Sequence, residues 1–163
     1  MRIWPAAMQD PEQLEELVML AKDLHSKKIL EIGTCAGGTA AALASSGAEV
    51  TTMDIQYLGP YPWETEEYKK EFPNAKVKFL QRDSRNFMGA QDVRLPNEEK
   101  YDLVFIDGEH SNLSGYMDWK QYGEMGKVIA LHDIAGYENR PDTDDWFPRN
   151  FWRMVIKWII KKN

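Results

Sequence analysis

A glycine-rich segment directly after a short apolar run is the feature that most constrains this chain. Residues 28–32 (KILEI) have the composition of a buried strand, and residues 33–38 (GTCAGG) follow at once. Glycines at such a junction let the backbone turn tightly and approach a ligand closely. The small, alanine-rich residues 39–46 then predict a helix that can lie close to a sheet. The junction therefore predicts a strand–turn–helix unit with a ligand near the turn.

The rest of the chain alternates between helical and strand patterns in the same way. We expect further strands at 49–53, 77–80, 101–106 and 127–131, and helices at 10–25, 63–72, 83–91, 113–122 and 147–162. Helices between successive strands imply a parallel sheet that is covered on both faces. The chain is thus predicted to form a single α/β domain, residues 1–163, around a doubly wound sheet of about five parallel strands.

An acidic residue, Asp54, ends the second predicted strand about 20 residues after Gly33. A carboxylate at that place can accept hydrogen bonds from ribose hydroxyls, so the glycine turn and Asp54 together predict an adenosine-type cofactor. Gly33 and Gly38 fit the dinucleotide pattern G-x-G-x-x-G, but Cys35 stands where its middle glycine should be. The cysteine side chain would obstruct a pyrophosphate, which disfavours the alternative of an NAD-dependent oxidoreductase.

Two later strand ends carry the candidate catalytic residues. Asp107 ends the strand 101–106, and His132 and Asp133 end the strand 127–131. If these strands are neighbours, two carboxylates and an imidazole lie side by side and could hold a divalent cation such as Mg²⁺ or Mn²⁺. His110 lies three residues after Asp107. Its unperturbed pKa of about 6.5 suits a general base.

Simpler interpretations of these residues stay open. Asp107 and Gly108 also suit the end of a strand, where the aspartate only caps the following turn. His110 could equally be a solvated loop residue. Residue types and spacing permit a metal and base site without requiring one.

The segment Glu31-x-Gly33-x-x-x-Gly37 resembles motif I of class I S-adenosylmethionine (SAM)-dependent methyltransferases, which have a Rossmann-like fold. The resemblance extends to Asp54, the ribose acid of that family, and to Asp83 and Ser84, where the family contacts adenine. It implies SAM as the cofactor. The cofactor-binding residues that it implies are Glu31, Gly33, Gly37, Gly38, Asp54, Asp83 and Ser84.

Longer segments look like the cephalosporin hydroxylase-like methyltransferases, which are similar to metal-dependent small-molecule O-methyltransferases. The matching segments are EIGTCAGGTAAAL, TTMDI, VFIDGEHS, VIALHDI and FWRMVIK. The resemblance implies that Asp107 and the pair His132–Asp133 bind a divalent ion. It also implies that His110 serves as the base, with Asp107 and Asp133 contributing to catalysis. The acceptor would be a hydroxyl of a small molecule, such as a sugar or another hydroxylated metabolite.

Methyltransferases of this kind usually finish with two strands that form an antiparallel hairpin at the sheet edge. The sequence after residue 133 predicts a polar loop at 134–145 and a helix at 147–162, with no such strands. We therefore expect a sheet that lacks the C-terminal β-hairpin, with an edge that the last helix or a second copy in a homodimer could cover. A non-catalytic SAM-binding subunit or regulator is the main alternative to an enzyme.

Charge and composition exclude several other classes. The net charge of −6 argues against a nucleic-acid partner, because such binding needs Lys and Arg to replace counterions on phosphates. The single cysteine, Cys35, allows no intrachain disulfide, which fits a reducing compartment. The sequence shows neither a secretory signal pattern nor an apolar run long enough for membrane insertion. We therefore expect a cytoplasmic protein.

Overall fold

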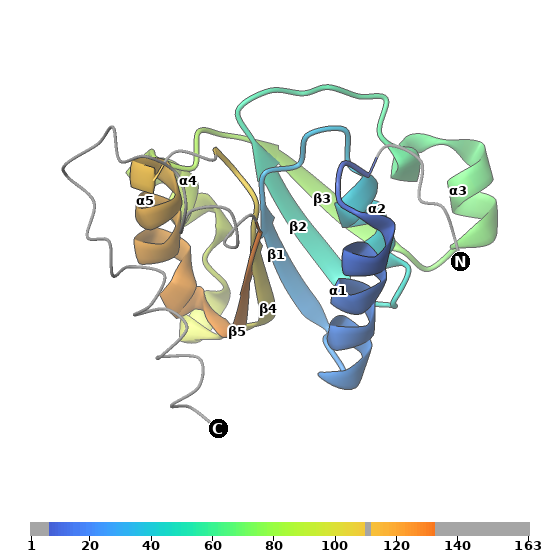
Figure 1. Ribbon diagram of the computed structural model, residues 1–163, viewed down its shortest axis with the longest axis horizontal. Coiled ribbons are helices and arrows are strands. Elements are labelled where there is room, and N and C mark those ends of the chain that lie inside the picture. The colour runs from blue at the N-terminus through green and yellow to red at the C-terminus, as the bar shows by residue number, and fades with distance from the viewer. Residues whose placement is uncertain (1–6, 110–111, 133–163) are drawn as a thin grey trace.

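The computed structural model describes residues 7–109 and 112–132. Five strands alternate with helices along the chain (Figure 1). The strands are β1 (Lys28–Ile32), β2 (Glu49–Asp54), β3 (Lys76–Gln81), β4 (Tyr101–Ile106) and β5 (Gly126–Leu131). The α-helices are α1 (Pro11–Asp23), α2 (Gly38–Ala44), α3 (Glu66–Glu71), α4 (Phe87–Val93) and α5 (Asn112–Tyr122), with short 3-10 turns at Pro62–Glu64, Pro96–Glu98 and Gly123–Met125.

The strands form one sheet in the order β3-β2-β1-β4-β5, and every neighbouring pair is parallel. The predicted doubly wound sheet of five parallel strands is thereby confirmed. β1 lies at the centre, where Ile32 pairs with Met53 of β2 and with Ile106 of β4. The carboxyl ends of all five strands meet at one edge, and each residue singled out at a strand end in this part of the chain lies there.

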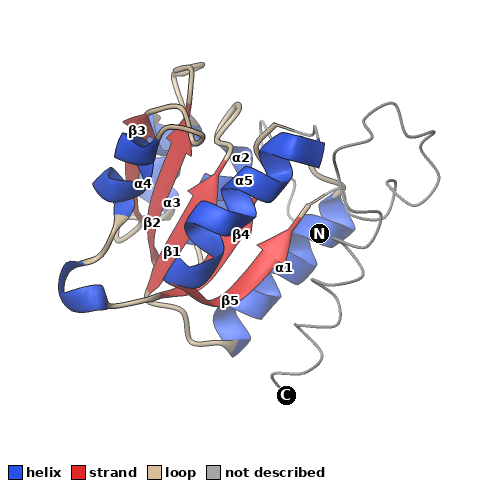
Figure 2. Ribbon diagram, turned by 90° about the vertical axis from the view of Figure 1, so that its left-hand side faces the viewer, coloured by secondary structure: helices blue, strands red, loops and turns tan. Residues whose placement is uncertain are grey.

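Helices cover both faces of the sheet. Figures 1 and 2 show α1 and α2 on one face and α4 and α5 on the other. Side chains alternate between the two faces, because successive residues of a strand point in opposite directions. Ile29 of β1 therefore packs in the core beneath α1 and α2, whereas Leu30 and Ile32 pack in the core on the side of α4 and α5.

Local capping explains where the helices begin. The Asp10 carboxylate accepts a hydrogen bond from the backbone of Glu12, and Pro11 opens α1, as the sequence predicts. The helix predicted at 83–91 is shorter, because residues 83–86 form a turn and the Asn86 side chain caps α4. The helix predicted at 63–72 is divided, because the Thr65 side chain caps α3.

The predicted loop 134–145, the predicted helix 147–162 and the expectation about the C-terminal hairpin lie outside the described residues. No helix within the described ranges is long and apolar enough to cross a membrane.

Candidate cofactor and active site

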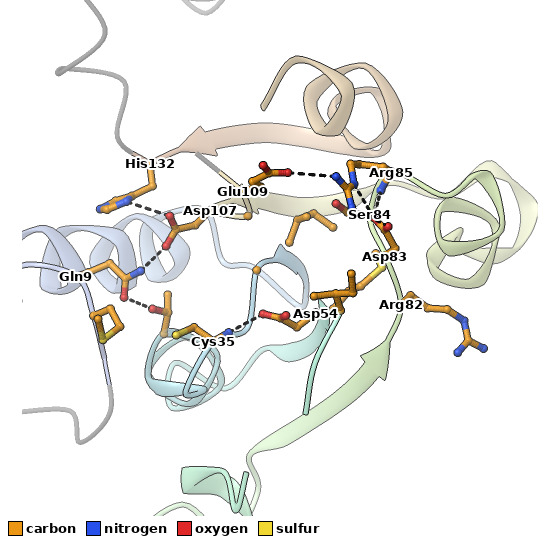
Figure 3. Close-up of a pocket in the computed structure, with 17 residues that line it drawn as sticks. Gln9, Cys35, Asp54, Arg82, Asp83, Ser84, Arg85, Asp107, Glu109 and His132 are labelled. Carbon is orange, nitrogen blue, oxygen red and sulfur yellow. Dashed lines mark hydrogen bonds and ion pairs between the residues drawn. The ribbon is translucent and has the colours of Figure 1, made fainter. Parts of the chain in front are cut away.

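A pocket of about 670 Å³ opens at the carboxyl edge of the sheet (Figure 3). Its walls come from the segments that follow the five strands and from residues 8 and 9, which precede α1. The volume lies within the range of about 300–1,000 Å³ that is usual for small-molecule sites. The fold thus places a pocket at the edge of the sheet where the sequence predicts a ligand.

The turn between β1 and α2 needs glycine at two positions. Gly33 and Gly37 have φ values of +98° and +82°, in the left-handed region that favours glycine. A Cβ on Gly33 would lie 2.0 Å from the carbonyl oxygen of Asp107, so the turn packs directly against the end of β4. Cys35 also has a positive φ, +46°, although it carries a side chain. Gly38, also predicted to contact the cofactor, is the first residue of α2.

Asp54 fixes this turn and also lines the pocket. Its Oδ2 accepts hydrogen bonds from the backbone N–H groups of Thr34 at 2.9 Å and Cys35 at 2.8 Å. Its Oδ1 accepts one from Gln56 at 3.2 Å. Each carboxylate oxygen has more than one acceptor site, so Asp54 keeps capacity to accept ribose hydroxyls. The residue therefore has a structural task that the sequence pattern did not indicate.

Glu31 lies behind the turn and is not part of the pocket wall. Its side chain is completely buried and accepts a hydrogen bond from the Thr52 hydroxyl at 2.5 Å. The Thr52 hydroxyl is also hydrogen-bonded to that of Thr34, at 2.6 Å, which links Glu31 to the glycine turn. Burial raises the pKa of Glu31 to about 8, so the carboxyl is largely protonated at neutral pH. The predicted contact between Glu31 and the cofactor stays a prediction.

The turn after β3 forms the wall of the pocket that lies opposite Asp107, His132 and Gln9 (Figure 3). Asp83 and Ser84 both line the pocket, as the sequence predicts. The Arg85 guanidinium binds both carboxylate oxygens of Asp83 at 3.0 Å and also contacts Glu109 at 3.3 Å. Hydrogen bonding to Arg85 is the main cause that lowers the pKa of Asp83. Figure 3 shows Arg85, Ser84 and Asp83 facing the side that carries Asp107, His132 and Gln9.

Four polar side chains, those of His132, Asp107, Gln9 and Thr39, contact one another in sequence on the other side of the pocket. Nδ1 of His132 lies 3.0 Å from Oδ1 of Asp107. Oδ2 of Asp107 accepts a hydrogen bond from the Gln9 amide, and the oxygen of that amide accepts one from the Thr39 hydroxyl. Asp107 and His132 are therefore brought together, as expected of neighbouring strand ends. Asp133 and His110 lie outside the described residues.

The described residues do not by themselves fit a metal centre. Within residues 7–109 and 112–132, no group of three His, Cys, Asp or Glu side chains converges as a metal site. Oδ1 of Asp107 lies 3.0 Å from Nδ1 of His132, and Oδ2 accepts a hydrogen bond from the Gln9 amide nitrogen. An amide N–H cannot serve as a ligand, since a metal needs a lone pair.

The donor set suits an adenosine ligand better. Asp54 presents carboxylate oxygens to the pocket, and the backbone N–H of Ser84 has no acceptor within the described ranges. The family model described as a methyltransferase domain matches residues 30–134, which is more than half of the chain. The chain belongs to this methyltransferase family. The predicted resemblance to class I SAM-dependent methyltransferases is thereby confirmed.

Solved structures with the same fold include methyltransferases bound to the cofactor or its product. An O-methyltransferase from Bacillus cereus, in complex with S-adenosylhomocysteine (SAH), has a TM-score of 0.66 and 20% identity, over 98% of this chain and 73% of that one. The SAM-bound O-methyltransferase TomG from Streptomyces achromogenes, involved in tomaymycin synthesis, has a TM-score of 0.64 and 18% identity, over 98% and 72% of the two chains. The SAH-bound methyltransferase PaMTH1 from Podospora anserina has a TM-score of 0.58 and 24% identity, over 94% and 68%.

Gln9, Arg85 and Glu109 are among the pocket-lining residues of this methyltransferase domain that the sequence patterns did not predict. Gln9 precedes the cap of α1, and only the folded chain brings it to Asp107 and Thr39. Arg85 and Glu109 are an ion pair between two turns that are distant in sequence. Their positions directly after Asp83–Ser84 and Asp107–Gly108 were the one available signal, because residues beside a strand end tend to share its site.

Proposed function

We propose that this domain transfers the methyl group of SAM to a hydroxyl of a small molecule, such as a sugar or another hydroxylated metabolite. The observation that carries the proposal is the pocket at the strand ends, in which the glycine turn is tied to Asp54. Membership of the methyltransferase family and the fold of the O-methyltransferases described above both support it.

The segments after β1, β2 and β3 would bind the cofactor. Asp54 would accept the ribose hydroxyls, and Asp83 and Ser84 would border the adenine. Gly33, Gly37 and Gly38 would keep the backbone close to the ligand, and Glu31 would support their turn from behind through Thr52. Of these residues, Gly33, Asp54, Asp83 and Ser84 line the pocket, whereas Gly37, Gly38 and Glu31 would act through the turn.

The segments after β4 and β5 would bind and deprotonate the acceptor. His110 would take the proton of the acceptor hydroxyl, while Asp107 and Asp133 would orient the base and the acceptor. When bound, SAM supplies a methyl group on a positively charged sulfur, which leaves as the neutral thioether SAH. The oxygen–carbon bond forms as the carbon–sulfur bond breaks, and the residues of the site mainly hold the two reactants in line.

A divalent ion at Asp107, His132 and Asp133 is a separate part of the proposal. The resemblance to metal-dependent relatives favours it, and Asp107 and His132 already lie together at the strand ends. Each carboxylate oxygen of Asp107 has a further acceptor site, and an ion there would lie beside the Gln9 amide that donates to Oδ2. Titration of the protein with Mn²⁺ or Mg²⁺, with and without SAH, tests this part alone.

The first experiment is calorimetric titration with SAH, with NADH as the control ligand. We expect micromolar binding of SAH and none of NADH. An acceptor screen with SAM and small hydroxylated compounds, read by formation of SAH, then tests turnover. Binding without turnover on any acceptor favours the non-catalytic alternative. Failure of the folded protein to bind SAH contradicts the proposal, and binding of NADH instead favours an oxidoreductase.

A further inference from the structure

Ser84 is held from behind by the last turn of α5. Its carbonyl oxygen accepts hydrogen bonds from Nε2 of Gln121 at 3.1 Å and from the Tyr122 hydroxyl at 2.7 Å. Tyr122 is fully buried, and burial raises the pKa of its hydroxyl, so it remains a neutral donor. Two neighbouring residues of one helix therefore bind the same carbonyl group in the pocket wall.

The two peptide groups that flank Ser84 are otherwise satisfied. The carbonyl oxygen of Asp83 accepts from the backbone of Asn86 at 3.0 Å, and the N–H of Arg85 donates to Oδ1 of Asp83 at 3.0 Å. With the Ser84 carbonyl bound to α5, three of the four polar groups have partners. The fourth, the N–H of Ser84, has no acceptor among residues 7–109 and 112–132.

An N–H group without a protein acceptor in a pocket wall needs one from solvent or from a ligand. Ser84 lines the pocket, and the Arg85 guanidinium, bound to both oxygens of Asp83, links the residues on either side of it. A flat heteroaromatic ring with lone pairs on its nitrogens meets this need, because the N–H can donate to a ring nitrogen. The adenine of SAM is such a ring.

A third residue of α5 reaches the same wall. Asp118 is completely buried, and its Oδ2 would lie 2.9 Å from a Cβ on Gly108. Burial raises the pKa of Asp118 to about 6. α5 therefore contacts pocket residues on the turns after both β3 and β4.

We propose that Gln121 and Tyr122 are positioning residues for the cofactor, which fix the Ser84 backbone so that its N–H donates to a ring nitrogen of adenine. The inference rests on the proposed function, since the ligand is the adenosine of SAM. Neither residue lines the pocket, so both act through Ser84. A peptide group that is already fixed loses little freedom when it binds a ligand, which favours affinity.

The variant Tyr122→Phe tests the proposal, with Tyr101→Phe as a matched control. Tyr101 is also a buried tyrosine whose hydroxyl donates to a carbonyl, that of Val93 at 2.6 Å, but it does not line the pocket. Each variant loses one buried hydroxyl and its hydrogen bond. We expect Tyr122→Phe to weaken SAH binding roughly fivefold, and Tyr101→Phe to leave it within about twofold.

Ligand analogues separate positioning from a general loss of stability. Deaza analogues of SAH, in which N1, N3 or N7 of adenine is replaced by C–H, each remove one ring acceptor. We expect one analogue to bind the wild type roughly fivefold more weakly than SAH. The difference in affinity between SAH and that analogue should be smaller in Tyr122→Phe and unchanged in Tyr101→Phe. The reason is that two changes give non-additive effects only where the altered groups contact one another or are linked.

Several results would overturn the inference. It fails if Tyr122→Phe binds SAH like the wild type, if both phenylalanine variants weaken binding equally, or if no analogue shows the non-additive effect. If Tyr122→Phe does not fold, Gln121→Leu carries the same test, because Gln121 is only half-buried. Failure of the wild type to bind SAH contradicts the proposed function instead, so the two failures are distinguishable.

Discussion

The imidazole of His132 lies 3.0 Å, from Nδ1 to Oδ1, from the carboxylate of Asp107. These residues follow β5 and β4, and their contact continues the backbone pairing of the two strands, in which the N–H of His132 donates to Ile106. The other oxygen of Asp107 binds Gln9. Asp107 therefore links the turn after β5 to the segment before α1.

Asp107→Asn is expected to impair turnover more than cofactor binding. An asparagine keeps one oxygen, but its NH2 group would face either Nδ1 of His132 or the amide nitrogen of Gln9. We expect turnover to fall on the order of tenfold or more, and SAH affinity to change by less than about threefold. Steady-state kinetics and calorimetry measure the two effects. Asp102→Asn, at an ion pair with Lys127 outside the pocket, is the control, and an unchanged turnover in Asp107→Asn would refute its catalytic role.

Asp54→Ala should weaken SAH binding roughly tenfold to a hundredfold, because it removes a charged acceptor and frees the glycine turn. Asp102→Ala is a close control. Its carboxylate also accepts two consecutive backbone N–H groups, from Lys27 at 2.8 Å and Lys28 at 3.1 Å, but it does not line the pocket. Both variants are measured by calorimetry. Equal affinities in the two would show that Asp54 acts only on the fold.

Asp133→Ala should leave SAH binding nearly intact and reduce turnover, since the proposed function assigns Asp133 to the acceptor half. The comparison with Asp54→Ala divides the two halves of the site. Loss of SAH binding in a folded Asp133→Ala protein would contradict that division.

Gly33→Ala should destabilise the domain far more than Gly47→Ala. Both glycines have left-handed backbones, with φ values of +98° and +96°. A Cβ on Gly47 meets nothing within 4 Å, whereas one on Gly33 would collide with the backbone of Asp107. We expect a loss of about 1 kcal/mol for Gly47→Ala and more than about 3 kcal/mol for Gly33→Ala in urea unfolding. Similar losses in both would show that the turn can move away from β4.

The buried carboxyl of Glu31 predicts a dependence of stability on pH. Its pKa is raised from 4.5 to about 8 by burial, so between these values the folded state binds a proton that the unfolded state has lost. Stability therefore falls as pH rises through this window, by at most about 1.4 kcal/mol per pH unit for one group. The pKa of Asp118 is about 6, so the part above pH 6 belongs mainly to Glu31.

Glu31→Gln should flatten this upper part of the curve. The amide keeps an oxygen for the Thr52 hydroxyl and carries no charge at any of these pH values. Urea unfolding at intervals from pH 6 to pH 8 measures the slope in both proteins. The same slope in wild type and variant would mean that Glu31 is ionised in the fold at neutral pH.

The sequence predicted β1, β2 and β4 well because each short apolar run is followed or ended by Gly33, Asp54 or Asp107. It predicted β1 at residues 28–32 and placed the polar residues at one edge through the rule for parallel sheets. Local caps were harder to foresee: Thr65 and Asn86 compete for backbone donors and so set where α3 and α4 begin. Contacts such as that of Gln9 with Asp107 depend on the tertiary fold and leave no local pattern.

The central position of β1 has a consequence for how such an enzyme can change. β2 and β3 lie on one side of it, and β4 and β5 lie on the other. In the proposed function, the segments after β2 and β3 bind the cofactor, and those after β4 and β5 bind the acceptor. Substitutions in the segments after β4 and β5 could then alter the acceptor, while the segments after β2 and β3 keep the same cofactor. Gly33 packs against the Asp107 carbonyl, so the cofactor-binding turn after β1 and the end of β4 must still fit together after any such change.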